Sequence, residues 1–238
     1  MATFVLLHGS WQGGWAWQRV RRLLAAAGHE VHAPTLTGLG ERSHLATPET
    51  GLAVHIEDVV RLLEGEDLSA VVLVGHSYSG LVVSGVAEAV PERLSRLVYL
   101  DAFVPADGQS AFDLMPVPGI AEQWIASARE HGGGWLVPPL PPESLGVTDP
   151  ADAAWVRSRL TPMPLRTHQE PVRLPADRAR ELPRSYVLCV GYPLFHRTAR
   201  RCERQGWPCH RLETGHSAMI TAPEALAGAL LAERAGAA

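Results

Sequence analysis

Lysine is absent from this 238-residue chain, since all 21 of its basic side chains are arginine. Catalysis through a lysine Schiff base is therefore excluded, as are the lysines of P-loop and kinase nucleotide sites. Positive charge is also in short supply, because 25 acidic side chains outnumber the bases and give a net charge of −4. This balance argues against nucleic-acid partners, whose phosphates need a basic surface.

Cysteines and long apolar runs are scarce as well. The three cysteines, Cys189, Cys202 and Cys209, are odd in number and lack metal-ligand spacing. They predict free thiols in a reducing compartment, and we expect neither a metal nor a cofactor. The chain starts without a basic leader, and no apolar run approaches the roughly 20 residues that cross a bilayer. We therefore expect a cytoplasmic protein without a membrane partner.

Strand and helix patterns alternate through most of the chain. Apolar runs of the buried-strand type are separated by segments with helical spacing of apolar residues. The strand-like runs cover residues 4–7, 30–33, 70–75, 97–100, 185–190 and 209–212. This alternation predicts an α/β fold, with a mostly parallel sheet of about six strands and helices on both faces.

The alternation is interrupted between residues 103 and 183. This segment holds 13 of the 19 prolines and three of the seven tryptophans. Because proline cannot donate a ladder hydrogen bond, we interpret residues 103–183 as an inserted cap of short helices and loops. Residues 1–102 and 184–238 then form the α/β core of the same domain.

A strand-to-helix turn at residues 75–80 reads Gly-His-Ser-Tyr-Ser-Gly. It approximates the Gly-x-Ser-x-Gly turn that presents a nucleophilic serine, although position 79 holds Ser where that pattern has Gly. Small neighbours relieve the crowding around a strained Ser77, so the pattern predicts Ser77 as a nucleophile. The main-chain N–H groups of Tyr78 and of Ser10, after the first strand, could bind an oxyanion.

A histidine late in the chain completes this pattern. His216 follows the last predicted strand, with Gly215 beside it. The chain order of such sites is serine, then acid, then histidine, and His216 has the required position. Of the 11 histidines, we therefore select His216 as the catalytic base.

These segments together resemble the α/β-hydrolase superfamily, and most closely its esterase and hydroxynitrile-lyase group, which includes plant methylesterases. The resemblance implies Ser77 as nucleophile, His216 as base and then acid, and Ser10 and Tyr78 as oxyanion donors. It also implies a carboxylesterase that acts on a small-molecule ester through an acyl-enzyme. The matching segments are residues 4–10, Gly13-Gly-Trp-x-Trp17, residues 75–80, residues 99–105 and Gly215-His216.

The catalytic acid departs from the family pattern. The family usually places it just after the strand that here spans residues 186–190, but Tyr192 stands there. A phenol carries no charge at neutral pH and cannot replace a carboxylate. Asp101 closes the strand at 97–100 on the same sheet edge, so we interpret it as the acid. The alternative is that Asp101 only fixes the loop. Glu213 would then be the acid, or the site would have no acid.

The lyase branch of the group fits less well. Hydroxynitrile lyases resemble this chain but have Thr in place of Gly9 and Lys in place of Ser217. Their lysine stabilises the departing cyanide, which a neutral serine cannot do. The sequence therefore favours an esterase over a cyanohydrin lyase.

Aromatic residues of the cap and of the first loop predict an apolar pocket for an uncharged, aromatic or alicyclic substrate. We expect it to be lined by Trp11, Phe103, Trp124, Trp135 and Trp155.

Two other functions stay open: a ligand-binding pseudo-hydrolase, and a non-hydrolytic enzyme of secondary metabolism such as a cyclase, a carbon–carbon-cleaving enzyme or a cofactor-free oxygenase. A homodimer is left open too.

Overall fold

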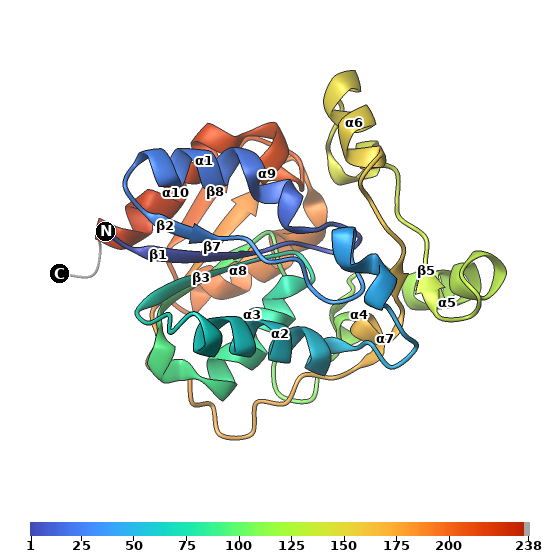
Figure 1. Ribbon diagram of the computed structural model, residues 1–238, viewed down its shortest axis with the longest axis horizontal. Helices are drawn as coiled ribbons and strands as arrows, with labels where there is room; N and C mark the ends of the chain where they lie inside the picture. The colour runs from blue at the N-terminus through green and yellow to red at the C-terminus, as the bar shows by residue number, and fades with distance from the viewer. Residues whose placement is uncertain (236–238) are drawn as a thin grey trace.

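The computed structural model describes residues 1–235 and contains a six-stranded parallel sheet between two layers of helices (Figure 1). The strands lie in the order β2-β1-β3-β4-β7-β8. Because all neighbouring pairs are parallel, their carboxyl ends meet at one edge. This confirms the predicted α/β fold. The strands are β1 (Thr3–Leu7), β2 (Glu30–His32), β3 (Val71–His76), β4 (Leu94–Leu100), β7 (Arg184–Cys189) and β8 (Cys209–Leu212).

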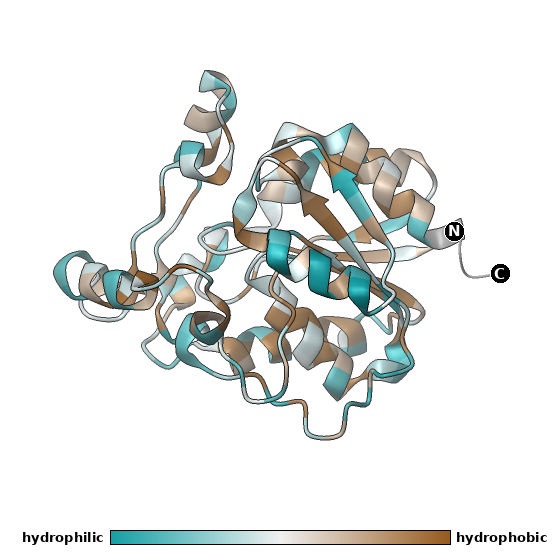
Figure 2. Ribbon diagram, turned by 180° about the vertical axis from the view of Figure 1, so that it is seen from behind, coloured by the Kyte–Doolittle hydropathy of each residue, from teal (hydrophilic) through white to brown (hydrophobic). Residues whose placement is uncertain are grey.

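Side chains alternate between the two faces of the sheet, and helices cover both faces. In β3, Val71 and Leu73 join one apolar core, whereas Val72 and Val74 join the other. The first face is covered by α2 (Leu52–Gly65), α3 (Ser79–Ala89) and α8 (His196–Arg204). The second is covered by α1 (Gln18–Ala26), α9 (Ala218–Thr221) and α10 (Pro223–Ala235). Burial on both faces explains the continuous apolar strands, and Figure 2 shows the hydrophilic outer side of α8.

Residues 103–183 add no strand to the large sheet. They form α4 (Ala111–Leu114), α5 (Ile120–His131), α6 (Pro150–Arg157) and α7 (Arg166–Gln169). They also form an antiparallel ladder of β5 (Leu136–Val137) and β6 (Met163–Pro164). The expectation of helices and loops alone was wrong here, because proline is tolerated in a ladder this short, where its missing N–H is not needed. The division into core and cap stays a prediction. Short 3-10 helices span Gly14–Trp17, Gly40–Leu45, Pro91–Arg93, Pro142–Leu145 and Pro193–Phe195.

Helix α6 is fixed to the core at α1. Arg19 donates to the Asp152 carboxylate at 2.9 Å and to the Ile220 carbonyl at 2.7 Å. The ring of Trp155 meets that of Trp15 edge-on, with their centroids 5.1 Å apart. These contacts join residues far apart in the sequence and hold α6 against the helix layer of the core.

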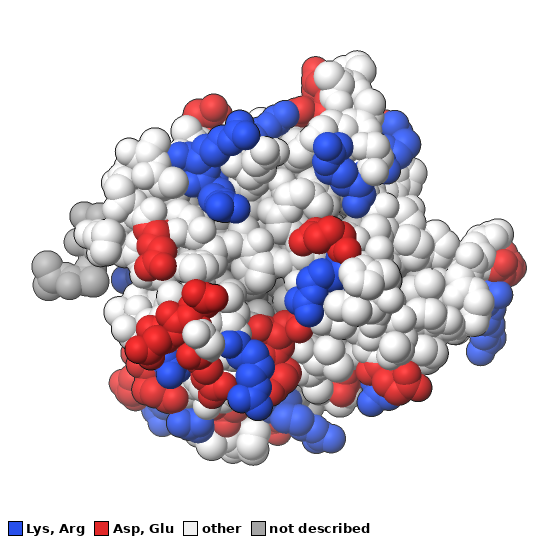
Figure 3. Space-filling model, viewed as in Figure 1, with Lys and Arg blue, Asp and Glu red and all other residues white. Residues whose placement is uncertain are grey.

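Charges of both signs are interspersed over the face of the molecule that Figure 3 shows. Several of them form exposed ion pairs, such as that of Arg61 with Glu57 and Glu64 on α2. Among residues 1–235, no helix combines the length and the apolar character that a membrane span requires.

Candidate active site

Ser77 lies in a strained turn between β3 and α3. Its φ of 57° is in the left-handed region, which non-glycine residues rarely adopt. Ser77 N–H donates to the Leu100 carbonyl at 3.1 Å, and Ser79 Oγ donates to the His8 carbonyl. A Cβ at Gly80 would lie 1.9 Å from the Phe103 carbonyl oxygen, so position 80 requires glycine. The hydroxyl of Ser79 thus adds a tether to the first loop that the strict motif lacks.

The structure brings Ser77, His216 and Asp101 together at the carboxyl edge of the sheet. His76 and Leu100 are register partners, so Ser77 and Asp101 follow them on adjacent strands. His216 Nε2 lies 2.9 Å from Ser77 Oγ, and His216 Nδ1 lies 2.7 Å from Asp101 Oδ2. These contacts match a nucleophile, a base and an orienting carboxylate.

Backbone contacts fix Asp101, the residue on which the sequence was ambiguous. Its φ is 42°, its N–H donates to the Val187 carbonyl at 2.7 Å, and its Oδ1 accepts from Cys189 N–H at 3.2 Å. The side chain is fully buried. Glu213, the alternative acid, is exposed on the surface.

Burial sets the protonation states of the pair. It lowers the pKa of His216 to about 3, so that the ring is neutral at neutral pH. It raises the pKa of the Asp101 carboxyl, whereas the hydrogen bond from Cys189 N–H favours the charged form. A neutral ring that donates from Nδ1 to Asp101 keeps the Nε2 lone pair for the Ser77 hydroxyl. The arrangement can therefore remove the Ser77 proton.

Two main-chain donors, the candidates for binding an oxyanion, lie beside Ser77. Within residues 1–235, neither Ser10 N–H nor Tyr78 N–H donates to a protein acceptor. The first loop packs tightly on the turn, because a Cβ at Gly9 would lie 2.7 Å from His76 Nδ1 and 3.0 Å from Ser77 Cβ. The close approach places the first loop beside Ser77. Because the two N–H groups have no protein acceptor, they are available for an oxyanion there.

The loop after β1 is joined to residues 103–183 through Trp11. Trp11 has a φ of 63°, which is unusual for so large a side chain. Its Nε1 donates to the Val137 carbonyl at 3.1 Å, and its carbonyl accepts from Thr161 N–H at 3.0 Å. These bonds hold the strained Trp11, which follows the candidate oxyanion donor Ser10, against the small β5-β6 ladder.

A second connection runs from Ser10 through His168. Thr167 Oγ1 donates to the Pro164 carbonyl at 2.7 Å, so it accepts from His168 Nδ1 at 3.0 Å. His168 Nε2 is then an acceptor for the Ser10 hydroxyl, at 3.2 Å. Burial lowers the pKa of His168 to about 3, which keeps this ring neutral. The tautomer therefore follows from the hydrogen-bond chain.

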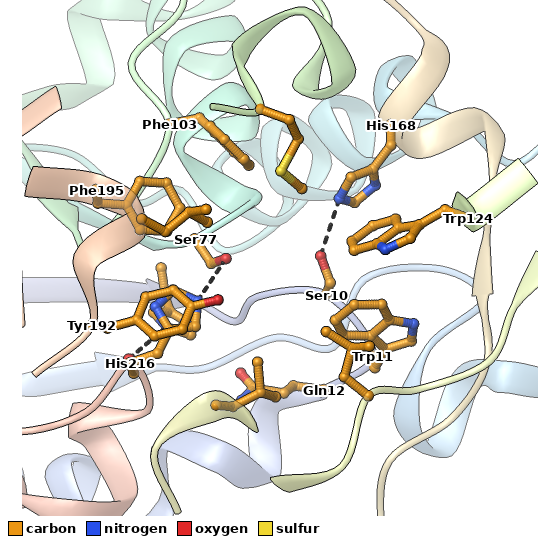
Figure 4. Close-up of a pocket in the computed structure, with 15 residues that line it drawn as sticks. Ser10, Trp11, Gln12, Ser77, Phe103, Trp124, His168, Tyr192, Phe195 and His216 are labelled. Atoms are coloured by element: carbon orange, nitrogen blue, oxygen red, sulfur yellow. Dashed lines mark hydrogen bonds between the residues drawn. The ribbon is translucent and has the colours of Figure 1, made fainter. Parts of the chain in front are cut away.

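A pocket opens above Ser77, and its walls are mostly apolar (Figure 4). Its cavity volume is about 40 Å³. The rings of Trp11 and Trp124 lie 5.0 Å apart on one side, whereas Tyr192 and Phe195 lie on the other. The lining residues are Ser10, Trp11, Gln12, His76, Ser77, Phe103, Met115, Trp124, Leu140, Leu145, His168, Tyr192, Leu194, Phe195 and His216.

Two of the predicted pocket residues lie elsewhere, so that part of the prediction was wrong. Trp11, Phe103 and Trp124 line the pocket, whereas Trp155 packs on Trp15 of the first 3-10 helix and on Arg19 of α1, and Trp135 lies beside Gly133 in the turn before β5. Gln12, the lining leucines and a role for His168 in the site were not predicted from the sequence. Of these residues, only Gln12 could have been found from the sequence, because it lies two positions after the candidate oxyanion donor Ser10.

Metal-ligating side chains do not gather in the described part of the chain: residues 1–235 hold no group of three or more His, Cys, Asp or Glu that could bind a metal ion. The groups that do meet at the pocket are a hydroxyl, a neutral imidazole, a carboxyl and two main-chain N–H donors. That set is suited to acyl transfer.

A model of the α/β-hydrolase family matches residues 4–229, so the chain belongs to this family. It is 38% identical to a carbendazim-hydrolysing esterase of Nocardioides sp., over 98% of this chain and 99% of that one. Methylesterase 1 of Arabidopsis thaliana is 39% identical over 104 residues, which are 43% of this chain and 40% of that protein. The chain is thus an α/β hydrolase of the esterase type.

Solved structures have the same fold. An extracellular α/β-hydrolase from a Paenibacillus species, described as homologous to tobacco salicylic acid binding protein 2, superposes with a TM-score of 0.86. It is 25% identical and covers 98% of both chains. An Arabidopsis methylesterase gives a TM-score of 0.78 at 24% identity, with 99% of both chains covered, which shows the fold.

Proposed function

We propose that this protein is a serine carboxylesterase that hydrolyses a small, largely apolar or aromatic ester through an acyl-enzyme. The observation that supports this most is the hydrogen-bonded series Asp101–His216–Ser77, with distances of 2.7 and 2.9 Å at the floor of an apolar pocket. Ser77 is the nucleophile, His216 the base and Asp101 the acid that orients His216.

Each proposed step uses a group at the site. Ser77 Oγ attacks the ester carbonyl while its proton passes to His216 Nε2, and the Asp101 carboxylate stabilises the imidazolium. The N–H groups of Ser10 and Tyr78 hold the tetrahedral oxyanion. The bond to the alkoxy oxygen then breaks, that oxygen takes the proton from His216, and water releases the acyl group by the same steps in reverse.

The pocket favours a neutral and small substrate. No arginine and no carboxylate lines it among the described residues, so an ionised substrate would lose hydration without gaining a charged partner. Relatives are named methylesterases and a carbendazim-hydrolysing esterase. We therefore propose methyl esters of small aromatic acids, and carbendazim itself, as substrates to test first.

Covalent labelling tests the proposal directly. A fluorophosphonate is expected to add to the protein once, at Ser77, because the hydroxyl is activated by His216. Intact mass and peptide mapping locate the adduct, and Ser77→Ala is expected to give none. Unlabelled wild-type protein that still binds aromatic esters would instead favour a ligand-binding pseudo-hydrolase.

Two tryptophans provide a matched test of the pocket. Trp124→Ala is expected to raise KM for an aromatic ester about tenfold, which corresponds to about 1.4 kcal/mol of lost contact, because Trp124 lines the pocket beside Trp11. Trp155→Ala removes an equal ring outside the pocket and is expected to leave KM unchanged. Steady-state kinetics give KM for both variants. Equal changes in KM would contradict the placement of Trp124 inside the pocket and of Trp155 outside it.

We also propose a reducing, cytoplasmic location. Cys189, Cys202 and Cys209 are free, and the first two are buried. Burial raises the pKa of the Cys189 thiol and brings that of Cys202 to about 11, which keeps both in the protonated, less reactive form.

A further inference from the structure

Tyr192 occupies the site where the family resemblance places a carboxylate, but it contacts His216 in a different way. It lies in the loop between β7 and the 3-10 helix Pro193–Phe195. Its ring stacks on the His216 imidazole, with centroids 4.3 Å apart and planes inclined by 25°. In Figure 4 its hydroxyl points into the pocket, on the side of the Ser77–His216 hydrogen bond. The phenol therefore faces the region where chemistry is proposed to occur.

The Tyr192 hydroxyl differs from those of the other three tyrosines. Tyr78 donates to His55 Nδ1 at 3.0 Å, Tyr186 donates to the Ala102 carbonyl at 2.8 Å, and Tyr99 shares a 3.0 Å bond with Ser84. Within residues 1–235, no hydrogen bond joins the Tyr192 hydroxyl to another protein group. Tyr192 lines the pocket and is only partly buried, so its hydroxyl is open to a molecule bound there. The free donor in the pocket wall therefore points to a partner on the substrate.

Tyr192 stays protonated under the conditions of the reaction. Burial, and secondarily the nearby Asp101, raise the pKa of the phenol above its ordinary value of 10. It is therefore a hydrogen-bond donor at neutral pH and can give up no proton to a base such as His216. Its aromatic face also lies against the ring that becomes cationic, which favours the imidazolium.

The position of the hydroxyl selects one atom of the substrate. His216 Nε2 receives the Ser77 proton and must return it to the alkoxy oxygen, so that oxygen lies near Nε2 when the intermediate collapses. The Tyr192 hydroxyl extends on this side of the stacked rings. We propose that Tyr192 is a catalytic residue that donates a hydrogen bond to the alkoxy oxygen of the ester; this inference depends on the proposed esterase function.

The step is balanced without further reactants. The bond between the acyl carbon and the alkoxy oxygen breaks, and its electron pair goes to that oxygen. The proton on His216 Nε2, which came from Ser77, transfers to the oxygen and releases the alcohol. Tyr192 keeps its own proton throughout and stabilises the charge that develops on the leaving oxygen. Its contribution is largest when the leaving group is a poor one.

Tyr192→Phe tests the role with two esters of the same aromatic acid, a methyl and a p-nitrophenyl ester. Methoxide needs stabilisation as it leaves, whereas p-nitrophenolate does not. Loss of the donor is expected to lower kcat/KM about 100-fold for the methyl ester, and to leave kcat/KM for the p-nitrophenyl ester nearly unchanged. The ratio kcat/KM reports acylation, so a slow deacylation of the activated ester cannot hide the effect.

Tyr99→Phe is the matched control, because it removes a tyrosine hydroxyl that bonds Ser84 away from the pocket. It is expected to lower thermal stability and to leave the ratio of the two kcat/KM values at the wild-type level. An equal loss on both esters in Tyr192→Phe, or no loss on either, would overturn the inference. Fluorophosphonate labelling of Ser77 in the wild type and in Tyr192→Phe separates the two proposals, because an unlabelled wild type would refute the esterase function, whereas labelling of both proteins leaves the kinetic ratio to decide the role of Tyr192.

Discussion

Replacing Asp101 with asparagine is expected to lower kcat about 10⁴-fold for an ester substrate while the protein stays folded. Asparagine has the same shape, tolerates the left-handed φ of 42° at this residue, and still offers an oxygen to Cys189 N–H. It lacks the charge that stabilises the His216 imidazolium. Its amide would also donate to Nδ1 and favour the tautomer with a proton on Nε2, facing Ser77. The loss therefore arises in the chemistry and not in folding.

The measurement is kcat for Asp101→Asn beside its melting temperature. Glu213→Gln is the matched control. Because Glu213 is exposed, this substitution is expected to change neither kcat nor the melting temperature. A wild-type rate in Asp101→Asn, or a large loss in Glu213→Gln, would transfer the role of the acid away from Asp101. A steep loss confined to Asp101→Asn would establish an acid on the strand next to the nucleophile.

The second large effect is on stability at mildly acidic pH. Burial lowers the pKa of five histidines, to about 4 for His8 and about 3 for His168 and His216, and also for His55 and His76. Below their ordinary value of 6.5 the unfolded chain binds protons that the folded chain rejects. Each histidine therefore costs up to about 1.4 kcal/mol of stability per pH unit below that value. The raised pKa of Asp101 acts in the opposite sense and offsets about one of them.

His8, His168 and His216 alone, less the offset from Asp101, can remove about 3 kcal/mol of stability per pH unit, against a total stability of about 5–15 kcal/mol. We therefore expect the free energy of unfolding to be largest above pH 6.5 and to fall steeply as the pH decreases. The protein is expected to unfold cooperatively by the time the pH reaches about 4. Urea unfolding midpoints at successive pH values measure the slope. His168→Gln is expected to make the slope shallower, whereas replacement of the exposed His131 is not. A flat profile below pH 6.5 would contradict the burial of neutral rings.

The sheet and the reacting groups were predictable from the sequence because they depend on local patterns and on one topological rule. Apolar runs fix the strands, and parallel pairing brings the residues after each strand to one edge. Ser77 follows β3, Asp101 follows β4 and His216 follows β8. Asp101 could be proposed only because Tyr192 left the usual position without a carboxylate. The hydrogen bonds of the structure agree with that proposal.

The pocket walls were less predictable, because they depend on how residues 103–183 pack. His168 meets Ser10 across 158 positions of sequence, and its role follows from a tautomer that no local pattern reveals. Trp124 and Trp155 are equally apolar, and only the packing of α6 on α1 turns Trp155 away from the pocket. Proline content likewise indicated loops but could not exclude a two-residue ladder at Pro164.

The tight fit at Gly9 restricts the evolutionary routes open to this protein. The lyase relatives that the sequence resembles have Thr at this position, yet a Cβ here would lie 2.7 Å from His76 Nδ1 and 3.0 Å from Ser77 Cβ. A threonine at position 9 would therefore require His76 or Ser77 to shift. Because His76 also donates to the His216 carbonyl at 2.9 Å, the strain would reach the segment of the base as well as that of the nucleophile. The lyase residue at position 9 therefore does not fit this site as a single substitution.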